Sequence, residues 1–178
     1  MSKSGHRRRL LKAAIRTLLA FAVFAAGGVA LGLRVNTSVS LPLGIYVRTA
    51  DPAARLVEFC PAEPFATESS ARGYRTAGMA CSDGGVPLLK PVVAIPGDHV
   101  VLTSEGMRVN GRLLPNSAPL LRDGLGRPLR PWSYGKYLVE TDTLWVASTY
   151  NAGSYDSRYM GPIRTNQIRG RLRALWLL

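Results

Sequence analysis

The chain has 178 residues, with 23 lysines and arginines against 11 aspartates and glutamates, and a formal net charge of +12. This length suits one domain of ordinary size with a short appendage. Apolar residues make up 47% of the chain and charged residues 19%, which argues against disorder, whose signature is many charges and few apolar residues. Two cysteines are too few for a disulfide-dense scaffold or a four-cysteine zinc site.

The positive charge is concentrated near the N-terminus. Residues 1–50 contain eight basic residues and no acidic ones, whereas residues 51–178 contain fifteen basic and eleven acidic residues, a net charge of only +4. A basic chain suggests nucleic-acid binding, but that function needs a basic face on the folded part. We therefore expect no nucleic-acid partner.

Residues 17–33, TLLAFAVFAAGGVALGL, contain no charged side chain. As a helix this run is about 26 Å long, close to the roughly 30 Å hydrocarbon core of a bilayer. Six basic residues precede it, and short basic flanks stay in the cytoplasm. We predict a basic cytoplasmic tail over 1–16, a transmembrane anchor over 17–33 and an exported domain over 34–178.

A cleavable signal peptide is an alternative for the N-terminal segment, because it also has a basic start, an apolar core and small residues. The apolar run is longer than is typical for such a core, and Arg34 follows it as a stop. A buried helix of a soluble protein is a third alternative, although it gives the six upstream basic residues no purpose. Both leading interpretations place the rest of the chain outside the cytoplasm.

The exported part shows no long amphipathic helical period. It has short apolar runs rich in β-branched residues and separated by Gly, Pro and Asn, at 91–95, 99–103, 107–109, 137–139, 144–147 and 172–178. Asn110-Gly111 is a strong hairpin signal, because both central residues of a type I′ turn need a positive φ. We predict a mainly β domain built from antiparallel strands.

Cys60 and Cys81 are the only cysteines, and they enclose a Gly-, Ala- and Ser-rich stretch that we expect to be a loop or extension. In an exported domain a disulfide is the default, with two buried free thiols as the alternative. Closing such a loop stabilises a protein by about 3 kcal/mol in the chain-entropy treatment. We expect no thiol to titrate in the absence of reductant.

The ionisable side chains restrict the available chemistry. His6 and His99 are the only histidines, which excludes a histidine-based zinc cluster, and we expect neither a metal nor a cofactor. A Ser-His-Asp triad would need His99, which lies in an apparent strand. Arginine cannot act as a general base because its pKa stays far above 7, whereas lysine can when burial disfavours its charged form.

Only Lys90 and Lys136 among the four lysines belong to the exported part. Lys90 lies in its most apolar stretch, LLKPVVAIPG, and Lys136 lies in the more polar SYGKYLVE. Lys90 is therefore the candidate base. The alternative is a surface lysine at a strand end that extends its ammonium to water.

Two further segments carry candidate catalytic groups. Residues 36–46, NTSVSLPLGIY, place Ser40 before Leu41-Pro42, where proline favours an extended backbone. An ordinary polar linker explains this segment equally well. Residues 151–163, NAGSYDSRYMGPI, are rich in turn-forming residues and hold several polar groups, Ser154, Asp156, Ser157 and Arg158. A capped turn with an Asp–Arg pair is the alternative there.

The segments in their order resemble a known family. SxSxPxGxY beside an apolar run, then KPVVAIPGD, then Asn-Gly, then SYDSRYMG is similar to the type I signal (leader) peptidases, membrane-bound serine proteases with a Ser–Lys dyad. The PxGxY ending and the cysteine-bounded segment before the lysine resemble the conjugative-transfer branch, the TraF-type pilin peptidases. The resemblance covers nearly the whole chain and implies a signal-peptidase-like antiparallel β catalytic domain.

The resemblance assigns roles residue by residue. Ser40 matches the nucleophile and Lys90 the general base. Ser38 matches the serine that completes the oxyanion hole with the Ser40 amide, and Ser154 the serine that hydrogen-bonds the lysine. Leu41 stands where leader peptidases usually have methionine, which changes no chemistry.

The resemblance also covers Asp156, which matches an acidic residue required in the conjugative branch, and Arg158, its neighbour in the motif. Asp156 is either a charge partner in the lysine network or a buttress paired with Arg158. A negative charge near Lys90 would oppose its neutral form, which favours positioning, substrate-amine binding or pairing with Arg158. Residues 150–153, YNAG, replace the Gly-Asp-Asn-Arg run of many leader peptidases, and this leaves the supporting contacts open.

The implied function is that of a serine endopeptidase anchored in the bacterial inner membrane, with the N-terminus in the cytoplasm and the catalytic domain in the periplasm. Its substrate is a membrane-inserted precursor, in this branch a pilin, and its partners include mating-pair or type IV secretion components. Either water or the pilin's own amino terminus resolves the acyl-enzyme, and the second route gives a cyclic pilin. A general signal peptidase and a non-catalytic anchored scaffold of a pilus or secretion complex are the alternatives.

Overall fold

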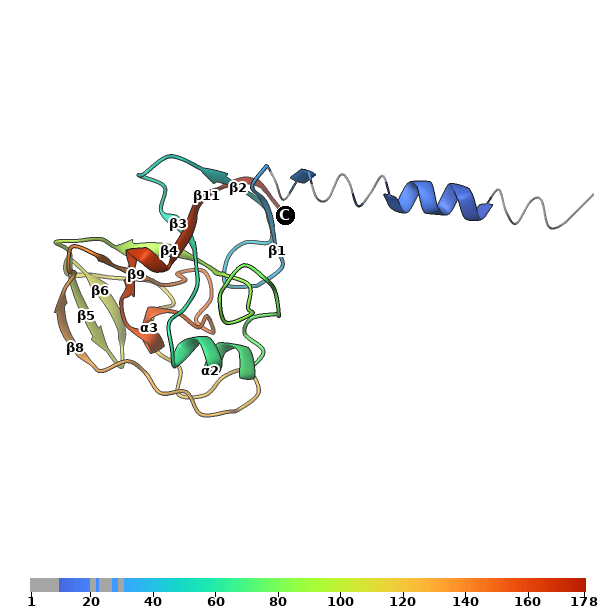
Figure 1. The fold of residues 1–178 in the computed structure, drawn as a ribbon. Coiled ribbons are helices and arrows are strands. Elements are labelled where there is room, and N and C mark those ends of the chain that lie inside the picture. The colour runs from blue at the N-terminus through green and yellow to red at the C-terminus, as the bar shows by residue number, and fades with distance from the viewer. Residues whose placement is uncertain (1–9, 20–21, 23–26, 29–30) are drawn as a thin grey trace, which may run out of the picture.

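The computed structural model describes residues 10–19, 22, 27–28 and 31–178 (Figure 1). Residues 10–19 are helical. About half of the predicted anchor over 17–33, residues 20–21, 23–26 and 29–30, lies outside this set, and so do residues 1–9 of the predicted tail over 1–16. Within the described residues, no helix combines the length and apolar character needed to cross a membrane.

The remainder of the chain forms two antiparallel sheets, which confirms the predicted mainly β architecture. The larger sheet has seven strands in the order β1-β2-β11-β3-β4-β9-β10. These strands are β1 (Leu33–Asn36), β2 (Gly44–Thr49), β3 (Leu56–Phe59), β4 (Leu88–Ala94), β9 (Thr143–Val146), β10 (Ile163–Arg164) and β11 (Ile168–Leu177). The long last strand β11 therefore lies between two strands from the beginning of the domain.

The smaller sheet has four strands in the order β7-β6-β5-β8. They are β5 (His99–Thr103), β6 (Gly106–Val109), β7 (Arg112–Leu113) and β8 (Gly135–Leu138). β5 has the bounds that its apolar run predicted. The Asn110-Gly111 hairpin is also confirmed, because these residues join β6 to β7 with φ values of 50° and 82°.

Strand β4 carries the predicted base into the interior. Its residues alternate between buried and half-buried positions, so that Leu88, Lys90, Val92 and Ala94 share the buried face. This period of two is the side-chain alternation of a pleated strand. A lysine in register with three apolar neighbours is directed into the core, and the structure accordingly leaves Lys90 only 3% exposed.

Strands β4 and β9 also connect the two apolar cores. Val92 and Val146 belong to the core of the larger sheet, to which residues of α3 (Ser157–Met160) also contribute. Ala94 and Trp145 belong to the core beneath the smaller sheet. The two adjacent strands therefore contribute to both cores, with a register irregularity between Val92 and Ala94.

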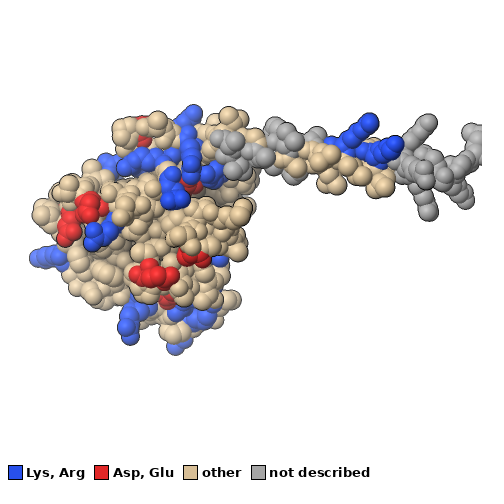
Figure 2. All heavy atoms as spheres, viewed as in Figure 1, with Lys and Arg blue, Asp and Glu red and all other residues tan. Residues whose placement is uncertain are grey.

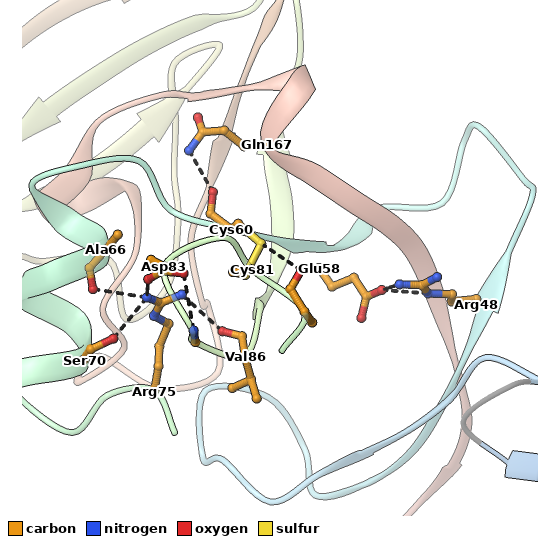
Figure 3. Close-up of a disulfide and its surroundings, with 12 residues drawn as sticks. Arg48, Glu58, Cys60, Ala66, Ser70, Arg75, Cys81, Asp83, Val86 and Gln167 are labelled. Atoms are coloured by element: carbon orange, nitrogen blue, oxygen red, sulfur yellow. Dashed lines mark hydrogen bonds and ion pairs between the residues drawn. A yellow bond between two sulfur atoms is a disulfide. The ribbon is translucent and has the colours of Figure 1, made fainter. Parts of the chain in front are cut away.

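Cys60 and Cys81 form the predicted disulfide (Figure 3). The enclosed segment is more ordered than the predicted loop, because it contains the helix α2 (Phe65–Ala71). The buried side chain of Arg75 organises it by donating to the Ala66 carbonyl and pairing with Asp83. A single guanidinium thus satisfies polar groups that apolar side chains could not.

The disulfide segment is also joined to the end of the larger sheet. The Gln167 side chain, in the short 3₁₀ helix η1 (Thr165–Gln167), donates to the Cys60 carbonyl over 3.0 Å. The Cys60 amide in turn donates to the Gln167 carbonyl over 3.0 Å. This two-way connection fixes the start of the segment against β11.

Candidate active site

The structure brings Ser40 and Lys90 together although 50 residues separate them in the chain. Ser40 lies in the turn between β1 and β2, and Lys90 projects from β4. The Lys90 Nζ donates to the Ser40 Oγ over 2.7 Å. The alternative of a surface lysine is wrong for Lys90, whose side chain is buried.

Burial lowers the pKa of Lys90 from 10.5 to about 8. The main cause is desolvation, which disfavours the charged ammonium. Two nearby charges act in opposite directions, because Asp156 raises this pKa and Arg158 lowers it. At slightly alkaline pH a large share of the molecules therefore carries a neutral amine hydrogen-bonded to the Ser40 hydroxyl, as a general base requires.

Asp156 and Arg158 form a fully buried ion pair beside this lysine. The Arg158 Nε donates to Asp156 Oδ1 and its Nη2 to Oδ2, each over 2.8 Å. The other guanidinium hydrogens go to three backbone carbonyls, those of Asn116, Ala152 and Ser154. A bidentate pair with its remaining donors satisfied is the arrangement in which a buried ion pair is tolerated.

This pairing answers the electrostatic objection to an acidic residue near a neutral lysine. The Asp156 charge is compensated by Arg158, and the two act on the Lys90 pKa with opposite signs. Asp156 also caps α3, because its carboxylate accepts from the Arg158 amide over 3.2 Å. The geometry agrees with the buttress alternative for Asp156.

The loop that carries Ser40 is shaped by Asn36, which sequence reasoning missed. Its side-chain nitrogen, Nδ2, donates to the carbonyls of Ser38, Leu41 and Pro42 over 2.9 to 3.2 Å. Its side-chain oxygen accepts from the Ser38 amide over 3.2 Å. The sequence signal was weak: asparagine readily bonds nearby backbone, but its position at the end of β1 becomes meaningful only in the fold.

The predicted oxyanion-hole groups lie side by side in this loop. The Ser40 amide donates to the Ser38 Oγ over 3.3 Å. Ser38 is exposed and Ser40 half-buried, so both groups can be reached from solvent. Their joint donation to an oxyanion stays a prediction, because it requires a bound substrate carbonyl.

Ser154 is buried, and among the described residues its hydroxyl has no hydrogen-bond partner. The bond from Ser154 to the lysine therefore also stays a prediction. A different serine, Ser148, contacts Ser40: its hydroxyl donates to the Ser40 carbonyl over 2.6 Å. Nothing in the sequence distinguished Ser148, because it lies six residues before Ser154 and outside the recognised motif.

The two remaining candidates from the sequence lie in the other sheet. His99 begins β5 and Lys136 lies in β8, and both side chains are exposed. Neither side chain has the buried surroundings that are typical of catalytic lysines and histidines. The structure thus separates the two lysines of residues 34–178 into one buried side chain, Lys90, and one exposed side chain, Lys136.

The site and fold described above define a mainly β protein with a serine and a buried lysine in direct contact. Comparison with known proteins gives its class: residues 13–177 match the family described as "Signal peptidase, peptidase S26". The match covers most of the chain, and the protein therefore belongs to this signal peptidase family.

Similar proteins are involved in plasmid transfer according to their names. A "Plasmid transfer protein TraF" of Escherichia coli is 37% identical over 169 residues, which is 93% of this chain and 94% of that protein. A "Conjugal transfer protein TraF" of Agrobacterium tumefaciens is 37% identical over 163 residues, 89% of each protein. A solved signal peptidase I from Enterococcus faecalis aligns over 69% of this chain and 97% of its own, with 16% identity and a TM-score of 0.37.

Proposed function

We propose that this protein is a membrane-anchored serine endopeptidase that processes an exported precursor, with Ser40 as nucleophile and Lys90 as general base. The observation that carries the proposal is the 2.7 Å contact between Lys90 Nζ and Ser40 Oγ, made by a lysine that is 3% exposed. A serine hydroxyl is a weak nucleophile unless a neighbouring base accepts its proton. Membership of a signal peptidase family supports the same chemistry.

The reaction begins when the Ser40 Oγ attacks the scissile carbonyl and Lys90 Nζ takes its proton. The Ser40 amide and the Ser38 hydroxyl donate to the oxyanion, and one such donor typically contributes a factor of about 10² to 10³ in rate. The Lys90 ammonium then gives its proton to the leaving amine as the peptide bond breaks. Ser154 orients Lys90 through its otherwise unpartnered hydroxyl.

The acyl-enzyme is resolved by a second nucleophile, which Lys90 deprotonates in turn. Water gives a free carboxylate, whereas the precursor's own amino terminus gives a new peptide bond and a cyclic product. The names of the TraF relatives favour a conjugative pilin as the precursor and a mating-pair or type IV secretion apparatus as the partner. A general signal peptidase is the second candidate, since the family name refers to signal peptidases.

Apolar side chains near the nucleophile support a position at a bilayer surface. Val35, Val39 and Leu43 are 74%, 62% and 41% exposed on the segment that carries Ser40. The end of β11 lies next to them, because the Leu178 amide donates to the Leu43 carbonyl. The last three residues of β11 and Leu178, which follows it, are also exposed and apolar.

Basic side chains gather near this apolar end of the molecule. Figure 2 shows them over the part of the body that holds β2, β3 and β11. Arg173, an exposed residue of β11, lies two residues before the exposed apolar residues 175–178. Such a combination suits anionic headgroups and acyl chains. We propose that residues 17–33 anchor the protein in the inner membrane, with 1–16 in the cytoplasm and 34–178 in the periplasm.

The test is precursor processing in cells that carry Ser40→Ala or Lys90→Met as the full-length protein. Both variants are expected to accumulate the uncleaved precursor while retaining the Cys60–Cys81 disulfide and membrane association. Lys136→Met, which replaces the exposed lysine of β8, is the matched control and is expected to process normally. Normal processing by both site variants would instead support the scaffold alternative.

Substrate range separates the two peptidase candidates. A pilin-specific enzyme is expected to leave one precursor uncleaved in the Ser40→Ala strain, whereas a general peptidase leaves many unrelated exported proteins uncleaved. Mass spectrometry of the mature pilin then identifies the second nucleophile, because a cyclic product is lighter than the linear one by one water.

A further inference from the structure

Ser148 has a hydrogen-bond arrangement that leaves its hydroxyl no freedom. The hydroxyl oxygen accepts from the amides of Tyr150 and Asn151 over 3.2 and 3.0 Å, and both of these groups can only donate. A serine hydroxyl has one hydrogen and two lone pairs. Its hydrogen is therefore committed to the Ser40 carbonyl, 2.6 Å away.

Ser148 is also fixed from the opposite side by the buried ion pair. Its amide donates to Asp156 Oδ2 over 3.0 Å, and the same oxygen accepts from Arg158 Nη2 over 2.8 Å. Ser148, Asp156 and Arg158 are each 0% exposed. A continuous set of hydrogen bonds thus runs from the guanidinium through the carboxylate and Ser148 to the backbone of the nucleophile.

The nucleophile depends on this connection because its own loop is exposed. Among the described residues, two hydrogen bonds join Ser40 to parts of the chain outside its loop, one from Lys90 to its Oγ and one from Ser148 to its carbonyl. The first bond changes during the reaction as the proton moves. The second can persist throughout, which makes it the fixed reference for the Ser40 backbone.

We propose that Ser148 is a positioning residue that transmits the rigidity of the Asp156–Arg158 pair to Ser40. By holding the Ser40 carbonyl, it keeps the Ser40 Oγ aligned with Lys90 Nζ. Asp156 then contributes through Ser148 rather than through its charge on the lysine. This inference rests on the proposed peptidase function.

The position of Ser148 predicts which kinetic constant it affects. A fully buried side chain cannot contact the substrate, so its loss acts on the reacting geometry and not on binding. Misplacement of a reacting group by about 1 Å can cost up to about 10²-fold in rate. Ser148→Ala is therefore expected to lower kcat by about 10- to 100-fold and to change KM by less than about twofold.

Ser117→Ala is the matched control for the structural effect. Ser117 is 2% exposed, and its hydroxyl accepts from the Met107 amide over 3.0 Å and donates to the Leu114 carbonyl over 2.6 Å. It thus has the same kinds of bonds as Ser148, but it lies in the loop after β7 and is bonded to the Met107 amide of the smaller sheet. Its replacement is expected to lower stability to a similar extent with kcat unchanged.

The experiment measures kcat, KM and the pH profile of full-length protein in membranes, with the precursor that accumulates in the Ser40→Ala strain. The acidic limb of the Ser148→Ala profile is expected to stay near that of the wild type, because the hydroxyl does not contact Lys90. A general loosening of the site would hydrate Lys90 and move the limb to higher pH. Ser148→Thr, which restores the hydroxyl, is expected to recover most of the lost kcat.

Several outcomes would overturn the role of Ser148. One is a wild-type kcat in Ser148→Ala while Ser40→Ala is inactive. Another is an equal loss of kcat in Ser148→Ala and Ser117→Ala. If Ser148→Ala does not fold, Ser148→Cys replaces it, since a thiol of similar size is only a weak donor, and the same criteria apply. Full processing by Ser40→Ala would overturn the proposed function together with this inference.

Discussion

The two sheets differ in what they bury. The smaller sheet covers a core of apolar side chains that includes Val100, Leu102 and Met107. The larger sheet buries Glu58, Lys90, Asp156 and Arg158 together with its apolar core. Buried charges reduce stability unless they are paired and hydrogen-bonded, so a protein retains them where another requirement outweighs the cost.

The difference indicates a division of labour between a scaffold and a site. Among the residues that the structure describes, each buried charge of the larger sheet is paired except that of Lys90, and the lowered pKa of Lys90 reflects the cost of its burial. Glu58, for instance, pairs with Arg34 of β1 and Arg48 of β2 across the intervening strand β11. Substitutions in the core of the smaller sheet are therefore expected to change stability alone. Substitutions of the buried charged residues of the larger sheet are expected to change activity as well.

The largest effect is expected from Asp156→Ala, because it leaves the Arg158 guanidinium buried without its partner. Breaking such a pair costs about 4 kcal/mol in the free energy of unfolding, and processing should fall as well. Chemical denaturation and the precursor assay measure the two effects. Asp142→Ala is the control, since Asp142 pairs with Arg164 on the surface with 57% and 69% of these side chains exposed, and we expect a loss below about 0.5 kcal/mol.

Leu102→Ala should be nearly as destabilising without affecting the chemistry. Leu102 is fully buried in the smaller-sheet core, and truncation there costs about 3 kcal/mol through lost burial and the cavity left behind. The processing rate per folded molecule is expected to equal that of the wild type. A large loss of activity in the folded variant would show that the smaller sheet is not a passive scaffold.

Lys90→Met is expected to act in the opposite direction, stabilising the fold while abolishing processing. A folded-state pKa of about 8 against 10.5 means that the unfolded state binds the proton more tightly. Burial of the ammonium therefore costs stability below pH 8, and methionine relieves it by about 2 kcal/mol at pH 7 after the lost contact with Ser40 is subtracted.

The stabilising effect of Lys90→Met should depend on pH in a definite sense. Between pH 8 and 10.5 the folded wild type carries a neutral amine and the unfolded chain a charged one, so wild-type stability rises with pH. The advantage of methionine must shrink over this window. An advantage that is constant from pH 7 to 10 would mean that Lys90 has an ordinary pKa.

The smallest effect concerns the pH dependence of the wild-type reaction. Because the base must be neutral, kcat/KM is expected to rise about tenfold per pH unit below pH 8 and to level off above it, and a tenfold change corresponds to about 1.4 kcal/mol in the barrier. Initial rates of precursor cleavage in a series of buffers measure the profile. A flat profile between pH 6 and 9 would argue against lysine as the base.

Part of the site could be predicted from the sequence because the chemistry left few choices. Residues 34–178 contain two lysines and one histidine, and the order of the motifs indicated Ser40, Lys90 and Asp156. The two cysteines of the chain indicated the disulfide. Asn36 and Ser148 could not be found in this way. Both residues act through hydrogen bonds to backbone atoms. The amino-acid sequence does not show which backbone atoms the fold brings within reach of a given side chain.

The sequence by itself determined the strand periodicity, the Asn110-Gly111 hairpin and the presence of one lysine in an apolar strand, because these follow from local backbone preferences and from composition. Only the tertiary structure decided that the turn after β1 meets β4, and that Asp156 connects to Ser40 through Ser148. Such contacts depend on the pairing of distant strands, and the free energy that selects the pairing is shared by the whole core.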